Sequence, residues 1–319
     1  MMNLRSSLNH HRQISAGAVP DVIHRRPFRV VAGVDWSSGS LAAIREIGHL
    51  YTPDELVLVH AMPSSPLESR IRSENVRPPS HHVLGTCHQQ SSVAAARRSL
   101  AWVSTLMQKT ISSTRREVCD VGAPAGVVLD QARTIGASLI VVGQRGVREG
   151  LDRTMGSVSH QICSNAHCST LVVRKPQRTP RRILAIIQQT EDVIALQRWL
   201  RTFPFKETSD LTVLCLMPRP QRGEPIGPLS AQFWKDAAVN HARWLVDPMV
   251  RDLDGPSLRV TGRAVWGHPP LIIQEASNFD LLMLHGSDRT DRYTSRSGLP
   301  WRALLRLAPC STLVVRTCS

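Results

Sequence analysis

The hexapeptide Ser-Thr-Leu-Val-Val-Arg occurs twice in this chain, at residues 169–174 and at residues 311–316. The apolar segments that precede the two copies fall in the same order. The segments of the first copy are Arg29–Val34, Glu55–Met62, Glu117–Val121 and Leu139–Val142, and those of the second are Ile183–Ile187, Leu211–Leu216, Leu258–Val265 and Leu281–Leu284. Recurrence of segments in a fixed order is typical of a tandem repeat. The sequence therefore predicts two copies of one fold.

Each copy alternates short apolar runs with longer segments of helical periodicity, such as 40–50, 91–112 and 125–135. Alternation of this kind predicts an α/β fold with a parallel sheet. Residues 175–180 are polar and contain two prolines, which is typical of a linker. We therefore predict a disordered basic tail at 1–28, a first domain at 29–176 and a second domain at 181–319.

The amino-acid composition of the chain argues against several classes of function. The chain is 42% apolar, yet no run of about 18 apolar residues occurs, so no membrane-spanning helix is expected. The formal charge of +14 suggests an anionic partner, but the arginines are scattered and aromatic residues make up only 4%. Nucleic-acid binding usually needs a clustered basic patch or stacking aromatics, and the sequence therefore disfavours it.

The seven cysteines form no Cys-x-x-Cys pair and no regular framework. Reduced thiols in the cytoplasm are the expected state. Two groups that contain His and Cys, at 81–88 and 163–168, lack the paired spacing of a zinc site. No metal site is expected from them.

The stretch 138–174 carries the clearest functional pattern. The apolar run Leu139–Val142 stops at Gly143, and Gly146, Gly156 and Ser157 follow before a segment of helical periodicity. Glycine lets backbone approach a phosphate, and a helix N-terminus presents free N–H groups to an anion. Strand, glycine loop and helix together predict a phosphate-binding loop, with Arg145, Arg148 and Arg153 as candidate counter-charges or simply solvated loop residues.

The pattern Gly-x2-Gly-x9-Gly-Ser, followed by a helix and a strand, resembles the ATP-binding motif of universal stress proteins. The turn Val34-Asp35-Trp36-Ser37 resembles the opening turn of that family. The resemblance implies that the phosphates and ribose of ATP contact the glycine loop, the adenosine part contacts the opening turn, and adenine lies against the end of the second strand. The residues assigned in this way are Asp35, Ala61 with His60, Val142, Gly143, Gly146, Gly156, Ser157 and Val158. For Asp35, a helix-capping role is the alternative.

The resemblance also implies two flavodoxin-like, Rossmann-like domains, each a five-stranded parallel sheet of order 3-2-1-4-5 with helices on both faces. The second copy has His285, Asp288 and Leu299 where the first has Gly143, Gly146 and Ser157. A carboxylate at Asp288 would repel phosphate. One nucleotide site per chain, in the first domain, is therefore expected.

We accordingly expect an ATP-binding universal stress protein, with Mg²⁺ accompanying the nucleotide, that regulates a stress or dormancy response in the cytoplasm. No base or arginine finger is evident, so an enzyme is not expected beyond weak ATPase activity. The alternatives are an interaction module of the same fold that binds no nucleotide, and a slow ATPase. The repeated strands Leu171–Val173 and Leu313–Val315 are expected to pair antiparallel as an intramolecular pseudo-dimer, and a homodimer stays open.

Overall fold

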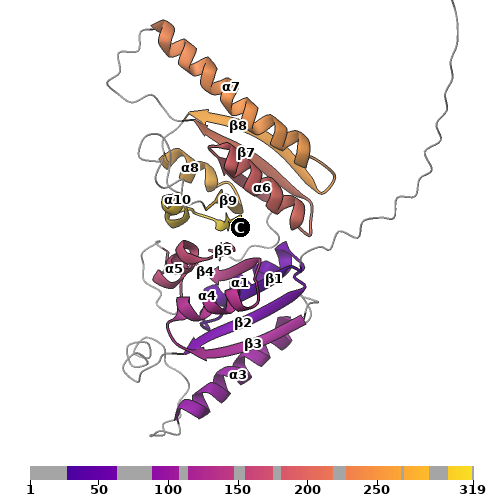
Figure 1. The fold of residues 1–319 in the computed structure, drawn as a ribbon, viewed down its shortest axis with the longest axis vertical. Coiled ribbons are helices and arrows are strands. Elements are labelled where there is room, and N and C mark those ends of the chain that lie inside the picture. The colour runs from indigo at the N-terminus through magenta and orange to yellow at the C-terminus, as the bar shows by residue number, and fades with distance from the viewer. Residues whose placement is uncertain are drawn as a thin grey trace, which may run out of the picture.

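The computed structural model describes residues 27–62, 88–107, 114–146, 155–174, 181–217, 228–266, 269–286 and 301–317. Within these residues, ten strands form a single sheet with helices on both faces (Figure 1). The strands are β1 (Arg29–Gly33), β2 (Glu55–Met62), β3 (Thr114–Val121), β4 (Leu139–Gly143), β5 (Ser169–Val173), β6 (Arg182–Ile187), β7 (Ser209–Met217), β8 (Leu258–Trp266), β9 (Leu281–His285) and β10 (Ser311–Val315). The helices are α1 (Ser38–Leu50), α3 (His88–Met107), α4 (Pro124–Thr134), α5 (Ser157–Asn165), α6 (Thr190–Thr202), α7 (Pro228–Leu253), α8 (Pro269–Ala276) and α10 (Trp301–Leu307).

The strand order is β3-β2-β1-β4-β5-β10-β9-β6-β7-β8. The first half of the sheet therefore has the order 3-2-1-4-5, and the second half repeats it in the opposite direction. All pairs inside each half are parallel, for example β1 with β4 and β6 with β9. The fold predicted from the sequence, two flavodoxin-like α/β units, is confirmed.

The two halves meet at β5 and β10, which pair antiparallel as expected. Leu171 lies opposite Leu313, and equivalent residues of the two halves form the same hydrogen bond on each side of this pair. The backbone N–H of Arg174 donates to Ser311 Oγ at 3.3 Å, and that of Arg316 donates to Ser169 Oγ at 3.0 Å. Edge strands carry unpaired N–H and C=O groups, and here each edge satisfies the other.

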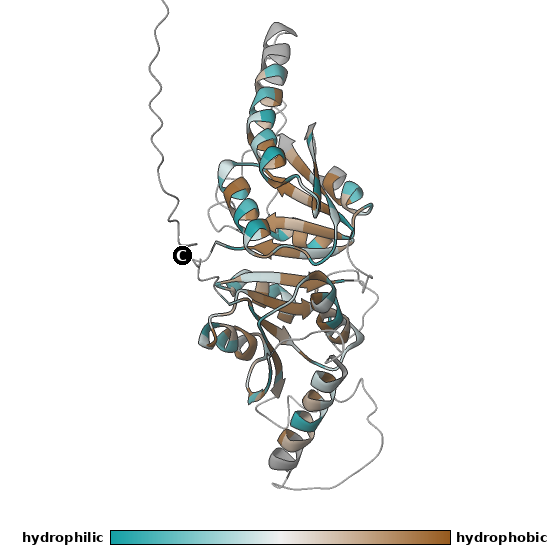
Figure 2. Cartoon of the chain, turned by 90° about the vertical axis from the view of Figure 1, so that its right-hand side faces the viewer, coloured by the Kyte–Doolittle hydropathy of each residue, from teal (hydrophilic) through white to brown (hydrophobic). Residues whose placement is uncertain are grey.

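Two hydrophobic layers cover the sheet. On one face, α1, α3, α6 and α7 pack over a continuous core that extends from Val30 in β1 to Val260 in β8. On the other face, α4 and α5 cover the first half, and α8 and α10 cover the second. Strands buried on both faces have continuous apolar sequences, and Figure 2 shows the central strands as hydrophobic while the helices alternate.

An aromatic cluster forms a second contact between the halves. Phe28 and Tyr51 from the first half pack against Trp199 and Phe203 from the second, with the Phe28 and Phe203 ring centroids 4.4 Å apart. The Trp199 indole N–H donates to the Tyr51 hydroxyl at 3.0 Å. Burial raises the pKa of Tyr51 above its usual range, and the bond from Trp199 partly opposes that rise. The halves are therefore held together both by the sheet and by the helical layer.

Several expectations from the sequence need adjustment. The third strand begins at Thr114, before the expected Glu117, because its polar first residues lie on an exposed strand. Three predicted segments fall outside the described residues in whole or in part. They are residues 1–26 of the tail predicted at 1–28, residues 63–87 and the linker at 175–180. The domain boundaries therefore stay predictions. Among the helices that the structure describes, none is long and apolar enough to cross a membrane.

Candidate functional site

The turn after β1 holds Asp35 by its own side chain. Asp35 Oδ1 accepts hydrogen bonds from the backbone N–H of Ser37 at 3.1 Å and from the Ser37 hydroxyl at 2.6 Å. Between them, Trp36 adopts a φ of 65°, a left-handed conformation that bulky residues rarely take. One face of the carboxylate is thus occupied in shaping the turn.

The N-terminus of α1 is closed by its own residues. Ser37 is the N-cap, and its hydroxyl oxygen accepts from the backbone N–H of Ser40 at 3.1 Å. The Ser40 hydroxyl donates back to the Ser37 carbonyl at 3.1 Å. The first of these bonds uses a backbone N–H that an anion would otherwise engage, so α1 offers an anion fewer free donors.

Gly143, at the end of β4, is required by packing between elements. A Cβ at this position would lie 2.6 Å from the carbonyl carbon of Gly39 and 2.8 Å from the backbone nitrogen of Ser40. The reverse is also true, because a Cβ on Gly39 would lie 2.9 Å from the Arg145 carbonyl oxygen. These two glycines let the β4 loop pass directly over the start of α1.

Gly146 faces the carboxylate of Asp35. A Cβ on Gly146 would collide with Asp35 Oδ2, so the glycine leaves this oxygen its room. The loop is closed further on, where the Gly156 N–H donates to the Gln144 carbonyl at 2.9 Å. The structure therefore brings together Asp35, Gly143, Gly146 and Gly156 at the carboxyl ends of β1 and β4, as the sequence predicted.

The N-terminus of α5 differs from that of α1 because no side chain caps it. Gly156 is the N-cap residue and makes no side-chain cap bond, and the first turn has no acidic residue. Ser157 is exposed at the first helical position. The Ser159 hydroxyl, in the same turn, is buried and donates to the Gly143 carbonyl at 2.7 Å, so it is not offered to a ligand. What α5 offers an anion is backbone N–H groups, the dipole and the Ser157 hydroxyl.

Positive charge gathers beside this loop. Burial lowers the pKa of Arg174 to about 10, the thiol of Cys310 opposes that shift, and the charge of Arg145 adds to it. Gly143 pairs with Val173 in the ladder of β4 and β5, so Arg174 follows β5 next to the start of the loop that contains Arg145. Arg148 and Arg153, the other candidate counter-charges, lie outside the described residues.

The end of β2 forms the other side of the site. Ala61 is buried there, and His60 Nδ1 donates to the Val34 carbonyl at 2.7 Å. The Trp36 ring lies 5.3 Å from the His60 ring and is 36% exposed. An exposed tryptophan ring at this edge of the sheet offers a surface on which a flat ring can stack. Sequence reasoning missed both Trp36 and Gly39, although the run Trp-Ser-Ser-Gly immediately before a helix marks an unusual turn.

Val142 precedes the loop and Val158 follows it, and both pack in the same hydrophobic cluster. Val142 is 5% exposed and is the last residue of β4 before Gly143, whereas Val158 is half-buried in the first turn of α5. Neither has a polar side chain to direct at a ligand. Their contribution is an apolar wall around the loop.

Together, these features define a class of α/β protein with a doubly wound parallel sheet and a glycine loop at the point where the strand order reverses. Proteins of this class bind ligands at that point, beyond the carboxyl ends of the strands. Residues 28–174 match the model of the universal stress protein family. Two curated relatives agree: universal stress protein MJ0531 of Methanocaldococcus jannaschii is 43% identical over 58 residues, and YxiE of Bacillus subtilis is 43% identical over 53 residues. Residues 28–174 of this chain are therefore similar to universal stress proteins.

These matched segments cover 18% and 17% of this chain and only 34% and 36% of the two relatives. Solved structures extend the likeness in fold to both halves. A universal stress protein from Archaeoglobus fulgidus DSM 4304 superposes with a TM-score of 0.56 at 11% identity, covering 90% of this chain and 96% of that one. A putative universal stress protein from Pseudomonas aeruginosa UCBPP-PA14 gives a TM-score of 0.58 at 12% identity, covering 92% and 95%.

Proposed function

We propose that the first half of this protein binds ATP at the crevice beyond β1 and β4, and that the protein regulates a stress response by binding. The observation that carries the proposal is the uncapped N-terminus of α5 beside the glycine loop. A helix start without a side-chain cap keeps backbone N–H groups for an anion, and phosphate is the anion that such loops most often hold. The match of residues 28–174 to the universal stress protein family model supports the same function.

The residues present fit a nucleotide. Gly156 would let phosphate oxygens approach the first turn of α5, where the Ser157 hydroxyl and backbone N–H groups would hold them. Arg145 would balance their charge, and Ala61 with Trp36 would bound the base. Asp35 keeps one oxygen, Oδ2, toward Gly146 and the crevice. Val142, Gly143, Gly146 and Val158 shape the walls of the same loop.

Magnesium would come with the phosphates. Among the described residues, no group of three or more His, Cys, Asp or Glu side chains could hold a metal ion. Mg²⁺ is commonly held by one or two carboxylates together with substrate phosphates. Among the described residues, the Asp35 carboxylate faces the glycine loop at Gly146, and its hydrogen bonds with Ser37 leave one oxygen for such a role.

The test is isothermal titration of ATP and Mg²⁺ into the purified chain, and we expect one site per chain. The informative variant is Gly156→Asp, because the aspartate would cap α5 with its own carboxylate and repel phosphate. A Cβ at Gly156 meets the Gln144 carbonyl at 3.2 Å, which is tight but tolerable, and the residue has an ordinary φ of −66°. We expect Gly156→Asp to abolish ATP binding while stability holds or rises by about a few tenths of a kcal/mol through capping.

The matched control is Gly156→Asn, which caps the helix without a charge. It should weaken binding less than Gly156→Asp, because only the aspartate adds charge repulsion. Unchanged ATP affinity in Gly156→Asp would refute the phosphate site. Binding of two equivalent nucleotides would refute the restriction to the first half.

The alternatives make different predictions in the same preparation. An interaction module of the same fold would give no heat with ATP. A slow ATPase would release phosphate at a rate abolished by Asp35→Ala, whereas a binding protein shows near-background release, far below the roughly 1–100 s⁻¹ of kinases. A homodimer, if formed, would be seen by light scattering with and without ATP.

A further inference from the structure

An arginine at the end of β5, Arg174, borders the candidate nucleotide site on the side of the second half. Val173 pairs with Gly143 in the ladder of β4 and β5. The Gln144 N–H donates to the Val173 carbonyl at 2.8 Å, and the Gly156 N–H donates to the Gln144 carbonyl at 2.9 Å. Two backbone hydrogen bonds therefore join the end of β5 to the uncapped start of α5, and Arg174 follows directly on that strand end.

The side chain of Arg174 is held by the second half. Its Nη2 donates to the carbonyls of Leu305 at 2.6 Å and of Arg306 at 3.1 Å, both in the last turn of α10. Leu305 belongs to the hydrophobic cluster against which Val158, in the first turn of α5, also packs. The guanidinium of Arg174 therefore lies on the face of the sheet that α5 and α10 share.

Arg174 carries a positive charge that no carboxylate pairs with in the part of the chain that the structure describes. Burial lowers its pKa only to about 10, so the guanidinium is protonated at neutral pH. Its Nη2 bonds go to neutral carbonyls, and its Nε is closed from solvent and has no hydrogen-bond acceptor among the described residues. Buried charges are usually paired with a charge of opposite sign. An anionic group of a ligand would supply that pair.

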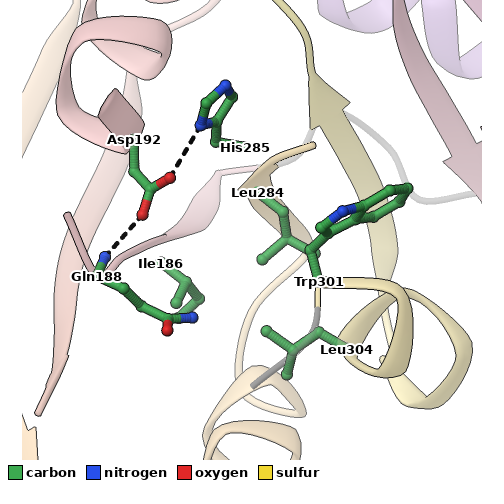
Figure 3. Close-up of a pocket in the computed structure, with 7 residues that line it drawn as sticks. All are labelled: Ile186, Gln188, Asp192, Leu284, His285, Trp301 and Leu304. Carbon is green, nitrogen blue, oxygen red and sulfur yellow. Dashed lines mark hydrogen bonds and ion pairs between the residues drawn. The ribbon is translucent and has the colours of Figure 1, made fainter. Parts of the chain in front are cut away.

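The corresponding crevice of the second half does not suit a phosphate. It lies at the carboxyl ends of β6 and β9, and Figure 3 shows the residues that line it. The Asp192 carboxylate lies there at the start of α6. Its Oδ2 accepts from the Gln188 backbone N–H at 2.9 Å, and its Oδ1 lies 2.9 Å from His285 Nδ1. This carboxylate closes the start of the helix and would repel an incoming anion.

Arg316 is the counterpart of Arg174 in the second half. It follows β10, and its Nη2 donates to the Cys163 carbonyl at 2.9 Å, in the last turn of α5. The second half has lost the glycine motif, so Arg316 makes the same kind of helix-end contact without a phosphate-binding loop beside it. A comparison of the two arginines therefore separates a helix-capping role from a ligand-binding role.

We propose that Arg174 is a phosphate-binding residue of the first half and that α10 of the second half positions it. The inference rests on the proposed function, because it requires ATP to bind at the glycine loop. The phosphates lie between the start of α5 and the guanidinium, whose Nε–H donates to a phosphate oxygen. The second half then completes the nucleotide site although its own glycine motif is lost.

The experiment is isothermal titration of the full chain with two probes, ATP with Mg²⁺ and adenosine as a competitor of ATP. Adenosine shares the base and the ribose with ATP but has no phosphate, so a phosphate-binding residue should affect the affinity for ATP alone. We expect Arg174→Met to weaken ATP binding about tenfold, the value of one hydrogen bond, and to leave adenosine binding as it is. Arg174→Lys keeps the charge and should recover part of the ATP affinity.

Arg316→Met is the matched control, since it removes the same side chain and the same kind of helix-end contact. It should lower the melting temperature about as much as Arg174→Met does, but it should leave the ATP affinity as it is. If Arg174→Met bound ATP like the parent, or lost ATP and adenosine affinity in equal proportion, the role of Arg174 would be refuted while the ATP site remained. No ATP binding by the parent would refute the proposed function, and the role of Arg174 with it.

Discussion

At the scale of single residues, the glycines of the candidate site have different roles although the sequence motif treats them alike. Gly143 is needed because another backbone passes against it, whereas Gly156 stands in an ordinary conformation with room for a side chain. Loss of ATP binding after a change at Gly143 would therefore report damage to the fold as readily as damage to a ligand contact. Gly156 is the position where the two effects separate.

Replacement of Gly143 by alanine should destabilise the protein by about 1–3 kcal/mol, since the added Cβ would overpack the start of α1. Gly126 in α4 is the matched control, because a Cβ there meets nothing within 4 Å. Gly126→Ala should raise stability by about 0.5–1 kcal/mol. Urea unfolding measures the free energy of unfolding of both variants. Equal changes in the two would show that the backbone around Gly143 has room for a side chain.

The buried thiol of Cys163 predicts an alkaline limit to stability. Burial raises its pKa from 9.0 to about 12, with Arg316 acting in the opposite direction. The folded state thus holds the proton more tightly than the unfolded state, so this stabilisation is complete below pH 9 and is lost as pH rises from 9 toward 12. The free energy of unfolding should fall between pH 9 and pH 11 by about 1 kcal/mol per pH unit from this group.

Unfolding free energies at pH 8 and pH 10.5 test this dependence. Cys163→Ala should be less stable than the parent at pH 8, because a buried group is lost, but should show a smaller decline with pH. Burial also raises the pKa values of Cys215 and Cys310 to about 11, so the free energy of unfolding of Cys163→Ala should still fall in part as pH rises. Parallel pH curves for parent and variant would contradict the assignment.

At the scale of elements, the repeated hexapeptide does more than form two strands. The arginine after each strand reaches a helix end in the other half: Arg174 Nη2 donates to the Leu305 carbonyl at 2.6 Å, and Arg316 Nη2 donates to the Cys163 carbonyl at 2.9 Å. Carbonyls in the last turn of a helix have no partner inside the helix, and a cation there is favourable. Each half thus caps a helix of the other.

Arg316→Met should therefore destabilise the junction by about 1–3 kcal/mol, because it leaves the end of α5 without its donor. Arg133→Met is the control, as Arg133 pairs with Asp130 on an exposed helix surface. Exposed pairs of this kind contribute about 0–1 kcal/mol, so little change is expected. Thermal unfolding compares them. If Arg316→Met lowered the melting temperature less than Arg133→Met, the capping role of Arg316 would be contradicted.

The elements were largely predictable because buried parallel strands have continuous apolar sequences. β2 and β4 were located from such runs, and the glycine loop followed from the end of β4. The start of β3 was missed because Thr114 to Arg116 are polar and the strand is exposed. The Asp192–His285 pair was also not foreseen, since its members lie 93 residues apart and only the sheet brings them together.

At the scale of the whole molecule, the halves share a continuous sheet and a continuous core. The antiparallel pairing of β5 with β10 could be expected from the repeated hexapeptide. The aromatic cluster could not, because Tyr51, which follows α1, and Trp199 in α6 are 148 residues apart and their sequences give no sign of a common partner. Lys206 adds to this contact by donating its Nζ proton to the Gly48 carbonyl at 2.8 Å.

Two separate contact regions predict that the halves unfold together. We expect a single calorimetric transition for the full chain, with equal calorimetric and van't Hoff enthalpies. Tyr51→Phe keeps the ring but leaves the buried Trp199 indole N–H without its acceptor, which should cost about 1–3 kcal/mol. Since α1 and α6 still pack on one core, the transition should move to lower temperature without splitting. Separate transitions for the two halves of the parent protein would show that neither the β5–β10 pairing nor the aromatic cluster couples their unfolding. A melting temperature of Tyr51→Phe equal to that of the parent would show that the Trp199–Tyr51 hydrogen bond does not contribute to this coupling.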